Sequence, residues 1–269
     1  MFKILVSDPL AQEGVDILKK VKEFQVDVKH KLLPEELKKI IKDYDALLVR
    51  SETKVTKEII EAATNLKVIG RAGVGLDNVD LSAASKRGII VMNTPGGNTM
   101  STAEHAVSLM LSLSRNIPQA DASVKRGEWE RKKFMGTEIS GKTLGIIGLG
   151  RIGTEVAKRA ISFGMKVIVY DPFLSMDKAN ELGIESGELK EIFKRADYIT
   201  VHSPLTEETK HIIDKNAVDY MKQGVRIINC ARGGIIDEAA ILEGINSGKI
   251  AGAAFDVYEK EPPAKDNPL

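Results

Sequence analysis

The sequence is poor in cysteine and has no excess of charge of one sign. Cys230 is the only cysteine among 269 residues, which excludes an internal disulfide framework and is typical of a reducing cytoplasm. The 39 Lys and Arg residues nearly balance the 38 Asp and Glu residues, so no overall basic field would attract nucleic acid or an anionic membrane surface.

Long hydrophobic runs are also missing. The apolar start of the chain is too short for a signal peptide and ends in a charge at Asp8. No apolar stretch reaches the length that spans a bilayer. We therefore expect a cytoplasmic protein with no membrane or nucleic-acid partner, and the sequence predicts no metal site.

Short apolar runs alternate with helical patterns in the first part of the chain. The strand-like runs are Ile4–Ser7, Phe24–Val28, Ala46–Val49, Lys67–Gly70 and Ile89–Met92. The helical patterns between them are Ala11–Lys20, Pro34–Ile41, Lys57–Ala63 and Asp80–Arg87. This alternation predicts a parallel sheet with right-handed crossovers, and a turn cluster at 93–98 ends it.

A second alternating unit follows two helical stretches, Ser101–Ser114 and a shorter one near Gln119–Arg126. Its strands are expected near Leu144–Ile147, Val167–Tyr170, Tyr198–Val201, Val225–Asn229 and Ala251–Val257. A chain of this length can form two cores. We therefore predict an α/β fold with two doubly wound parallel-sheet lobes, residues 1–97 and 98–269.

The segment 143–153 carries a Gly-x-Gly-x-x-Gly turn between a buried strand and a helix. Gly148 lets the chain turn tightly off the strand, and Gly150 removes the Cβ that would block a pyrophosphate. Gly153 lets the new helix pack closely on the sheet, and the N-terminus of that helix offers free N–H groups to the anion. This arrangement is the fingerprint of a dinucleotide site.

An acid follows the second strand of this unit, about 20 residues after the glycine turn, as the fingerprint requires. Asp171 is positioned to accept hydrogen bonds from the adenosine ribose, and its charge repels a 2′-phosphate. Residues 170–173 contain no arginine that would reverse this preference. The sequence therefore predicts NAD rather than NADP, with the alternative that Asp171 merely caps the turn before Pro172.

Two later segments end strands at the edge where wound sheets bind their ligands. Arg232 follows a buried strand, and its planar guanidinium can grip a carboxylate or polarise a carbonyl. Residues 253–262 end another strand with two acids, Asp256 and Glu261. This combination favours a 2-oxo or 2-hydroxy acid as the substrate.

The helical stretch over 103–113 has an apolar face that includes Met110, Leu111 and Leu113. This face is too hydrophobic to stay in water, so it either joins the core of the chain or forms an interface with a second copy. Elsewhere, we expect Asp237 to be a helix N-cap and Cys230 to be an inert packing thiol.

With these segments in place, the chain resembles the D-isomer-specific 2-hydroxyacid dehydrogenase family over nearly its whole length. Residues 49–51 and 70–80 resemble that family's substrate-lobe loops, while 129–136 and 201–206 are similar to its phosphoglycerate-oxidising members. The resemblance implies a flavodoxin-like substrate lobe that lacks its C-terminal completing helix, and a Rossmann NAD lobe. It also implies a homodimer formed through inserted helices near 101–136.

The resemblance implies roles for individual residues. Arg232 and Glu261 would be catalytic: Arg232 would bind the substrate's carboxylate and carbonyl, and Glu261 would orient a histidine and raise its pKa. The residues implied at the cofactor are Val74, Gly148, Gly150, Arg151, Ile152, Gly153, Asp171, Ser203, Pro204, Cys230, Ala231, Arg232 and Asp256. Those implied at the substrate are Arg50, Arg71, Asn78 and Arg232.

In that family the acid–base histidine lies in a Pro-His-x-Gly segment, one strand beyond the position of Glu261. This sequence stops at Leu269, before any such segment, so we expect a truncated dehydrogenase that binds NAD but is weakly active or inactive. The histidines that are present are interpreted as surface, packing or structural residues. They are His30, His105, His202 and His211.

Three classes of function stay open. The first is NAD-dependent oxidation of a D-2-hydroxy acid, with 3-phosphoglycerate to 3-phosphohydroxypyruvate in serine biosynthesis as the first choice and a hydroxypyruvate or glyoxylate reductase as its neighbour. The second is a nonenzymatic, NAD-sensing corepressor-like protein, which would not need both Arg232 and Glu261. The third is an unrelated wound-sheet enzyme such as a methyltransferase, which would not explain residues 231–234 together with Asp256 and Glu261.

Overall fold

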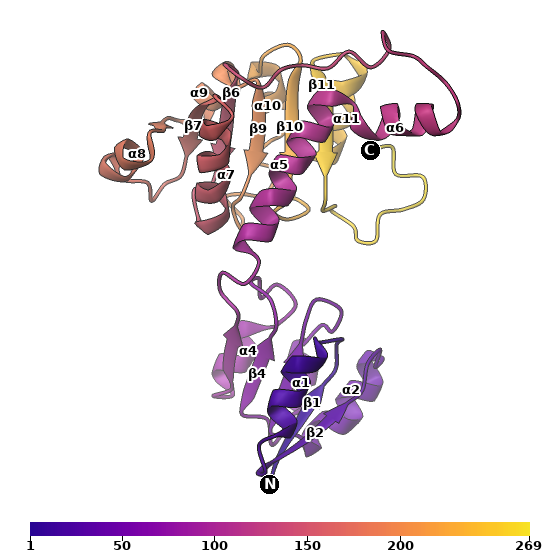
Figure 1. Cartoon of the computed structure of the whole chain (residues 1–269). Helices are drawn as coiled ribbons and strands as arrows, with labels where there is room; N and C mark the ends of the chain where they lie inside the picture. The colour runs from indigo at the N-terminus through magenta and orange to yellow at the C-terminus, as the bar shows by residue number, and fades with distance from the viewer. The chain divides into compact units, whose positions relative to one another are not determined.

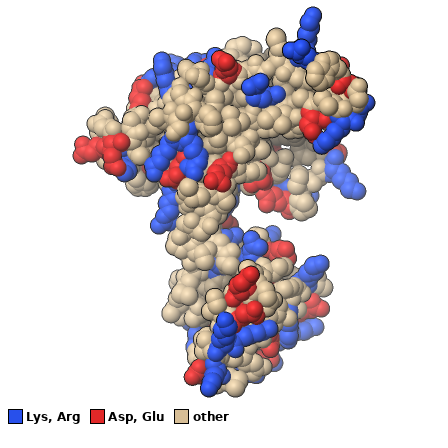
Figure 2. Space-filling model, viewed as in Figure 1, with Lys and Arg blue, Asp and Glu red and all other residues tan.

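The computed structural model describes all residues from 1 to 269, which form two compact units, Met1–Asn98 and Thr99–Leu269 (Figure 1). Each unit is a parallel sheet covered by helices, so the predicted α/β fold with two doubly wound lobes is confirmed. No helix is both long and apolar enough to cross a membrane. Figure 2 shows positive and negative side chains interspersed on the visible face of each unit.

The first unit has five strands in the order β2-β1-β3-β4-β5, which is the flavodoxin-like order. The strands are β1 (Phe2–Val6), β2 (Phe24–Val28), β3 (Ala46–Val49), β4 (Val68–Arg71) and β5 (Ile90–Asn93). The helices are α1 (Gln12–Lys19), α2 (Pro34–Ile40), α3 (Lys57–Ala62) and α4 (Leu81–Lys86), with a 3₁₀ turn η1 (Ile41–Asp43). Every strand that the pattern predicted is present, with bounds that differ by at most two residues.

One continuous core lies between this sheet and helices α2, α3 and α4. Leu5 and Leu47, on neighbouring strands, are fully buried in it. Edge strand β5 behaves differently: Val91 contacts the core, but Ile90 is 59% exposed and Met92 is 56% exposed. Because side chains alternate across a strand, these two point away from the face that α3 and α4 cover.

The second unit has six strands in the order β11-β10-β9-β6-β7-β8, which is the Rossmann order. The strands are β6 (Thr143–Ile147), β7 (Lys166–Tyr170), β8 (Glu185–Ser186), β9 (Tyr198–Val201), β10 (Val225–Asn229) and β11 (Ile250–Phe255). The order reverses between β6 and β9, and wound sheets bind ligands outside the carboxyl ends of their strands at such a point. The glycine turn, which follows β6, therefore lies where a ligand is expected.

Helices cover both faces of this second sheet. Helices α5 and α7 pack against each other and, with α8, bury one core, whereas α9, α10 and α11 bury the other (Figure 1). The helices are α5 (Thr99–Arg115), α6 (Ile117–Lys125), α7 (Arg151–Ser162), α8 (Met176–Leu182), α9 (Leu189–Arg195), α10 (Lys215–Tyr220) and α11 (Glu238–Asn246). Asp237 caps α11 as predicted, because its carboxylate accepts the N–H groups of Ala239 and Ala240.

Helix α5 turns its apolar face toward the core of its own unit. Met110 is only 2% exposed and is buried with Ala103 and Val107, while Leu111 and Leu113 are half-buried. The helix lies against α7, β10 and β11, which explains this burial. Of the two interpretations of this face, intrachain packing therefore applies to Met110, which is not available to a second copy.

Candidate functional site

The glycine turn between β6 and α7 uses its three glycines in different ways. Gly148 has a φ of +94°, and a Cβ there would lie 2.9 Å from the backbone nitrogen of Ser203. A Cβ on Gly153 would lie 2.2 Å from the carbonyl oxygen of Gly148. At Gly150, in contrast, no residue beyond its neighbours comes within 4 Å of the Cβ position. Two glycines therefore make the turn possible, and the third leaves open space in front of it.

Helix α7 begins at this open space. Its N-cap, Gly150, has no side chain to cap the helix, and the N–H groups of a first helical turn have no partner inside the helix. A helix N-terminus of this kind favours an anion through its N–H groups and its dipole. The arrangement can hold a pyrophosphate beside Arg151 and Ile152.

Asp171 closes the same turn from the end of β7. One carboxylate oxygen accepts the N–H of Leu149 at 2.6 Å, and the other accepts the N–H of Phe173 at 2.8 Å. Asp171 therefore does cap the local turn. Each carboxylate oxygen has a second lone pair, so this capping leaves the carboxylate able to accept a ribose hydroxyl as well.

Ser203 follows β9 and lies against the glycine turn. Its hydroxyl is buried without any hydrogen-bond partner, although an unpaired buried hydroxyl is costly. A Cβ on Gly148 would strike the backbone of His202 and Ser203. An unsatisfied hydroxyl beside an open, anion-favouring turn fits a bound dinucleotide that supplies the missing partner.

The segment after β10 folds around the side chain of Asn229, which the sequence pattern did not single out. Its Oδ1 accepts the N–H of Ala231 at 3.0 Å, and its Nδ2 donates to the carbonyl of Arg232 at 3.0 Å. Burial and the negative charge of Asp256 raise the pKa of the Cys230 thiol to about 12. Cys230 is buried in a core of the second unit, as expected for a packing thiol.

The segments that carry Arg232 and Glu261 are in direct backbone contact. A Cβ on Gly233 would lie 1.8 Å from the carbonyl oxygen of Tyr258, so only glycine allows this approach. The N–H of Tyr258 donates to the carboxylate of Glu261 at 3.1 Å. The structure therefore brings the two predicted catalytic residues onto adjoining segments at the carboxyl ends of β10 and β11.

A second set of contacts holds the Glu261 segment, and no local pattern indicated it. His211 Nε2 lies 3.1 Å from the carboxylate of Glu259, and the N–H of His211 donates to the carbonyl of Gly234 at 2.9 Å. The N–H of Glu259 donates to the carboxylate of Glu238 at 2.6 Å. His211 therefore connects the segment that carries Arg232 with the segment that carries Glu261.

The other three histidines differ in burial and in their neighbours. Burial lowers the pKa of His202 to about 4, so this ring is neutral at neutral pH, and its Nε2 lies 3.0 Å from the hydroxyl of Thr200. His105, on α5, lies 3.3 Å from the carboxylate of Asp256. His30 is exposed on the first unit. No group of three or more His, Cys, Asp or Glu residues could hold a metal ion.

Of the four predicted substrate residues, Arg50, Arg71 and Asn78 belong to the first unit, and Arg232 belongs to the second. The amide nitrogen of Asn78 donates to the carbonyl of Arg50 at 2.7 Å, and its Oδ1 lies 3.3 Å from Nε of Arg71. The fold thus brings these three residues together at the carboxyl ends of β3 and β4. Val74 is held nearby, because its carbonyl accepts the side-chain amide of Asn93 at 2.7 Å.

Comparisons with known proteins give a consistent result. Residues 107–269 match the sequence family described as D-isomer specific 2-hydroxyacid dehydrogenase, NAD binding domain. The D-3-phosphoglycerate dehydrogenase of Archaeoglobus fulgidus is 55% identical over 267 residues, which cover 99% of this chain and 50% of that protein. Its counterpart in Methanocaldococcus jannaschii is 55% identical, over 100% of this chain and 51% of that protein. The chain spans about half the length of these relatives.

Solved structures share the fold. The TT0316 protein from Thermus thermophilus superimposes with a TM-score of 0.91 at 34% identity, over 98% of this chain and 85% of that one. A D-lactate dehydrogenase from Aquifex aeolicus, complexed with NAD and lactic acid, superimposes with a TM-score of 0.86 at 31% identity, over 98% of this chain and 82% of that one.

Proposed function

Because the chain belongs to the D-isomer-specific 2-hydroxyacid dehydrogenase family, we propose that it serves NAD-dependent oxidation of D-3-phosphoglycerate to 3-phosphohydroxypyruvate, the entry to serine biosynthesis. The observation that carries the proposal is the close approach of Gly233 to Tyr258, which places Arg232 and Glu261 on adjoining segments. That pair suits a 2-hydroxy acid, and the relatives named above support phosphoglycerate as the acid.

Residues 107–269 are the NAD-binding domain of this family. The open turn at Gly150, the N-terminus of α7 and the unpaired hydroxyl of Ser203 are the features that would hold NAD. Asp171 would accept the ribose hydroxyls and repel a 2′-phosphate. When bound, NAD supplies the hydride acceptor. Pro204 remains a proposed contact of the adenosine half of the cofactor, and Cys230, Ala231 and Asp256 remain proposed contacts of its nicotinamide half. Val74, from the first unit, also remains a proposed cofactor contact.

Substrate binding and the positioning of the proton acceptor would fall to side chains of this chain. Arg232 would hold the substrate carboxylate and polarise the C2 oxygen, because its planar fork can donate two parallel hydrogen bonds. Glu261 would orient the group that takes the hydroxyl proton. A phosphoglycerate carries two anionic groups, and Arg50 and Arg71 would supply the additional cations that it needs.

A kinetic assay tests the proposed function. The full gene product that contains this chain should form NADH from NAD⁺ when D-3-phosphoglycerate is added. Arg232→Lys keeps the charge but loses the fork, so kcat/KM should fall roughly 10–100-fold. A higher kcat/KM for hydroxypyruvate or glyoxylate reduction would replace this function with that of the reductase. NADH binding without turnover of any of these acids would favour the sensor.

Asp171 provides a separate test of cofactor choice. In Asp171→Asn the side chain keeps its shape and one acceptor oxygen, but it loses the negative charge. NADH should bind about tenfold more weakly, because a charge-assisted hydrogen bond to the ribose is lost. The ratio of NADPH to NADH affinity should rise, because the repulsion of the 2′-phosphate is removed. Fluorescence titration measures both, and unchanged NADH affinity would rule out the ribose contact.

The proposed homodimer has support in α6 and the segment that follows it. Ile117, Val124, Trp129 and Met135 are exposed there, and Trp129 and Met135 are 77% and 81% exposed. Large apolar side chains gathered in one segment are typical of a protein interface. Sedimentation should give a dimer, and Trp129→Ser should shift it toward monomer; a monomeric wild-type protein would disprove the homodimer.

A further inference from the structure

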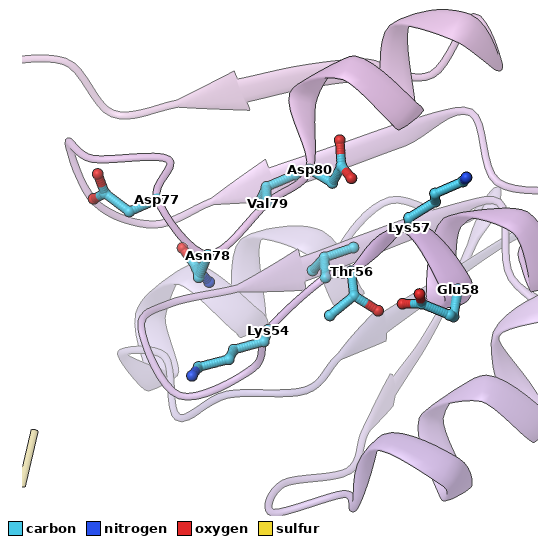
Figure 3. A pocket seen from close by; sticks show the side chains of 9 residues that line it. Lys54, Thr56, Lys57, Glu58, Asp77, Asn78, Val79 and Asp80 are labelled. Carbon is cyan, nitrogen blue, oxygen red and sulfur yellow. The ribbon is translucent and has the colours of Figure 1, made fainter. Parts of the chain in front are cut away.

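The side-chain amide nitrogen of Asn78 is fully occupied by contacts within the first unit. It lies in the loop after β4, between Asp77 and Val79 (Figure 3). Its amide nitrogen donates to the carbonyls of Arg50 at 2.7 Å and Thr53 at 2.6 Å. A side-chain amide has two donor hydrogens, and both are used here. The amide nitrogen of Asn78 therefore has no hydrogen left to offer a substrate.

A buried carboxylate holds the same loop from the other side. Asp8, just after β1, is only 1% exposed, and a buried charge is costly unless several donors satisfy it. Its oxygens accept the N–H of Arg50 at 2.6 Å, the N–H of Thr53 at 3.1 Å and the hydroxyl of Thr53. All three donors come from the loop that follows β3.

The backbone adds a further connection between the two loops. The N–H of Val55 donates to the carbonyl of Asn78 at 2.7 Å, and the N–H of Asp80 donates to the carbonyl of Val55 at 3.0 Å. Residues 50–55 are therefore bound on one side by Asp8 and on the other by the loop 77–80. Oδ1 of Asn78 also accepts a hydrogen bond from Nε of Arg71. The side-chain amide of Asn78 therefore contacts both the backbone of Arg50 and the side chain of Arg71.

The hollow next to Asn78 does not explain this arrangement as a ligand site. It has a volume of about 580 Å³ and is lined by acids and lysines together, as Figure 3 shows. The lining charges are Lys54, Lys57, Glu58, Asp77 and Asp80. Mixed charges of this kind give no preference for an anion. The role of Asn78 is therefore sought in its hydrogen bonds to the segments that carry Arg50 and Arg71.

We infer that Asp8 and Asn78 are positioning residues that hold the backbone of Arg50 and the guanidinium of Arg71 in one arrangement before an anionic substrate binds. The inference rests on the proposed function, and it replaces the expectation that Asn78 contacts the substrate directly. Fixing the two arginine segments in advance avoids the entropy cost of ordering them on binding. The benefit should therefore appear in substrate affinity rather than in cofactor affinity.

Two measurements on Asn78→Ala test the inference. In the full gene product, KM for D-3-phosphoglycerate should rise at least tenfold, with little change in the KM for NAD. In the 269-residue chain, the backbone N–H groups of residues 50–55 should exchange with solvent faster than in the wild type, because the hydrogen bonds that fix the loop are lost. Asp8→Asn should act in the same direction.

Glu58→Gln is the matched control, because Glu58 lines the same hollow but makes no contact with residues 50–53. It should leave both measurements unchanged. Unchanged exchange and unchanged substrate KM in Asn78→Ala would overturn the inference, as would an equal loss of NAD and substrate affinity with a lower melting temperature. If the wild type does not oxidise 3-phosphoglycerate, the proposed function fails, and the exchange measurement alone decides whether Asn78 holds the loop.

Discussion

Replacing Gly233 with alanine should lower kcat/KM for phosphoglycerate oxidation by about 100-fold or more, because a displacement of about 1 Å at a catalytic group can have that effect. The new methyl group would lie 1.8 Å from the carbonyl oxygen of Tyr258 and 2.2 Å from its carbonyl carbon. Neither atom belongs to a flexible side chain that could turn away. The segments of Arg232 and Glu261 must therefore separate.

Steady-state kinetics of the full gene product and NADH titration together measure this effect. NADH affinity should change much less than kcat/KM, since the glycine turn proposed to hold the pyrophosphate follows a different strand, β6. Gly14→Ala is the control: Gly14 is inside α1, no atom lies within 4 Å of its Cβ position, and the substitution should stabilise the protein slightly. Wild-type kcat/KM in Gly233→Ala would show that the contact does not position the pair.

Gly150→Ala should weaken NADH binding with little change in stability, whereas Gly153→Ala should lower the stability of the protein. At Gly150 a methyl group meets no protein atom within 4 Å, and φ is −67°, which alanine adopts without strain. The free energy of unfolding should therefore stay within about 0.5 kcal/mol. The methyl group would occupy the space proposed for the pyrophosphate, so NADH affinity should fall about 100-fold, or about 2.7 kcal/mol.

At Gly153 the methyl group would instead meet the backbone of Gly148 at 2.2 Å. Helix α7 packs on β6, β7 and α5, so moving its first turn disturbs the core. The free energy of unfolding should fall by about 1–3 kcal/mol, and NADH affinity should fall with it. Urea unfolding without ligand and NADH titration separate the two variants. A Gly150→Ala protein that binds NADH as tightly as the wild type would contradict the assignment of the open space.

Local patterns predicted the strands that bury a continuous run of side chains. All five strands of the first sheet and five of the six in the second were predicted from their apolar runs. Strand β8 was missed because it consists of only two exposed residues, Glu185 and Ser186, which show no alternation of apolar and polar side chains. The face of α5 was ambiguous for a different reason: the same apolar stripe suits a core or an interface, and only the packing of α5 on α7 placed Met110 in the core.

By itself, the sequence determined the glycine turn, Asp171 and the nature of the cofactor, because residues 143–171 form one local strand–turn–helix–strand unit whose spacing carries the chemistry. Only the tertiary structure decided which residues hold the arginines. Asp8 and Arg50 are 42 residues apart in the chain, and Asn78 and Arg50 are 28 apart. Such contacts depend on strand order and register in the sheet, which no local pattern encodes. The approach of Gly233 to Tyr258 is of the same kind, since parallel pairing of β10 and β11 brings these segments to one edge.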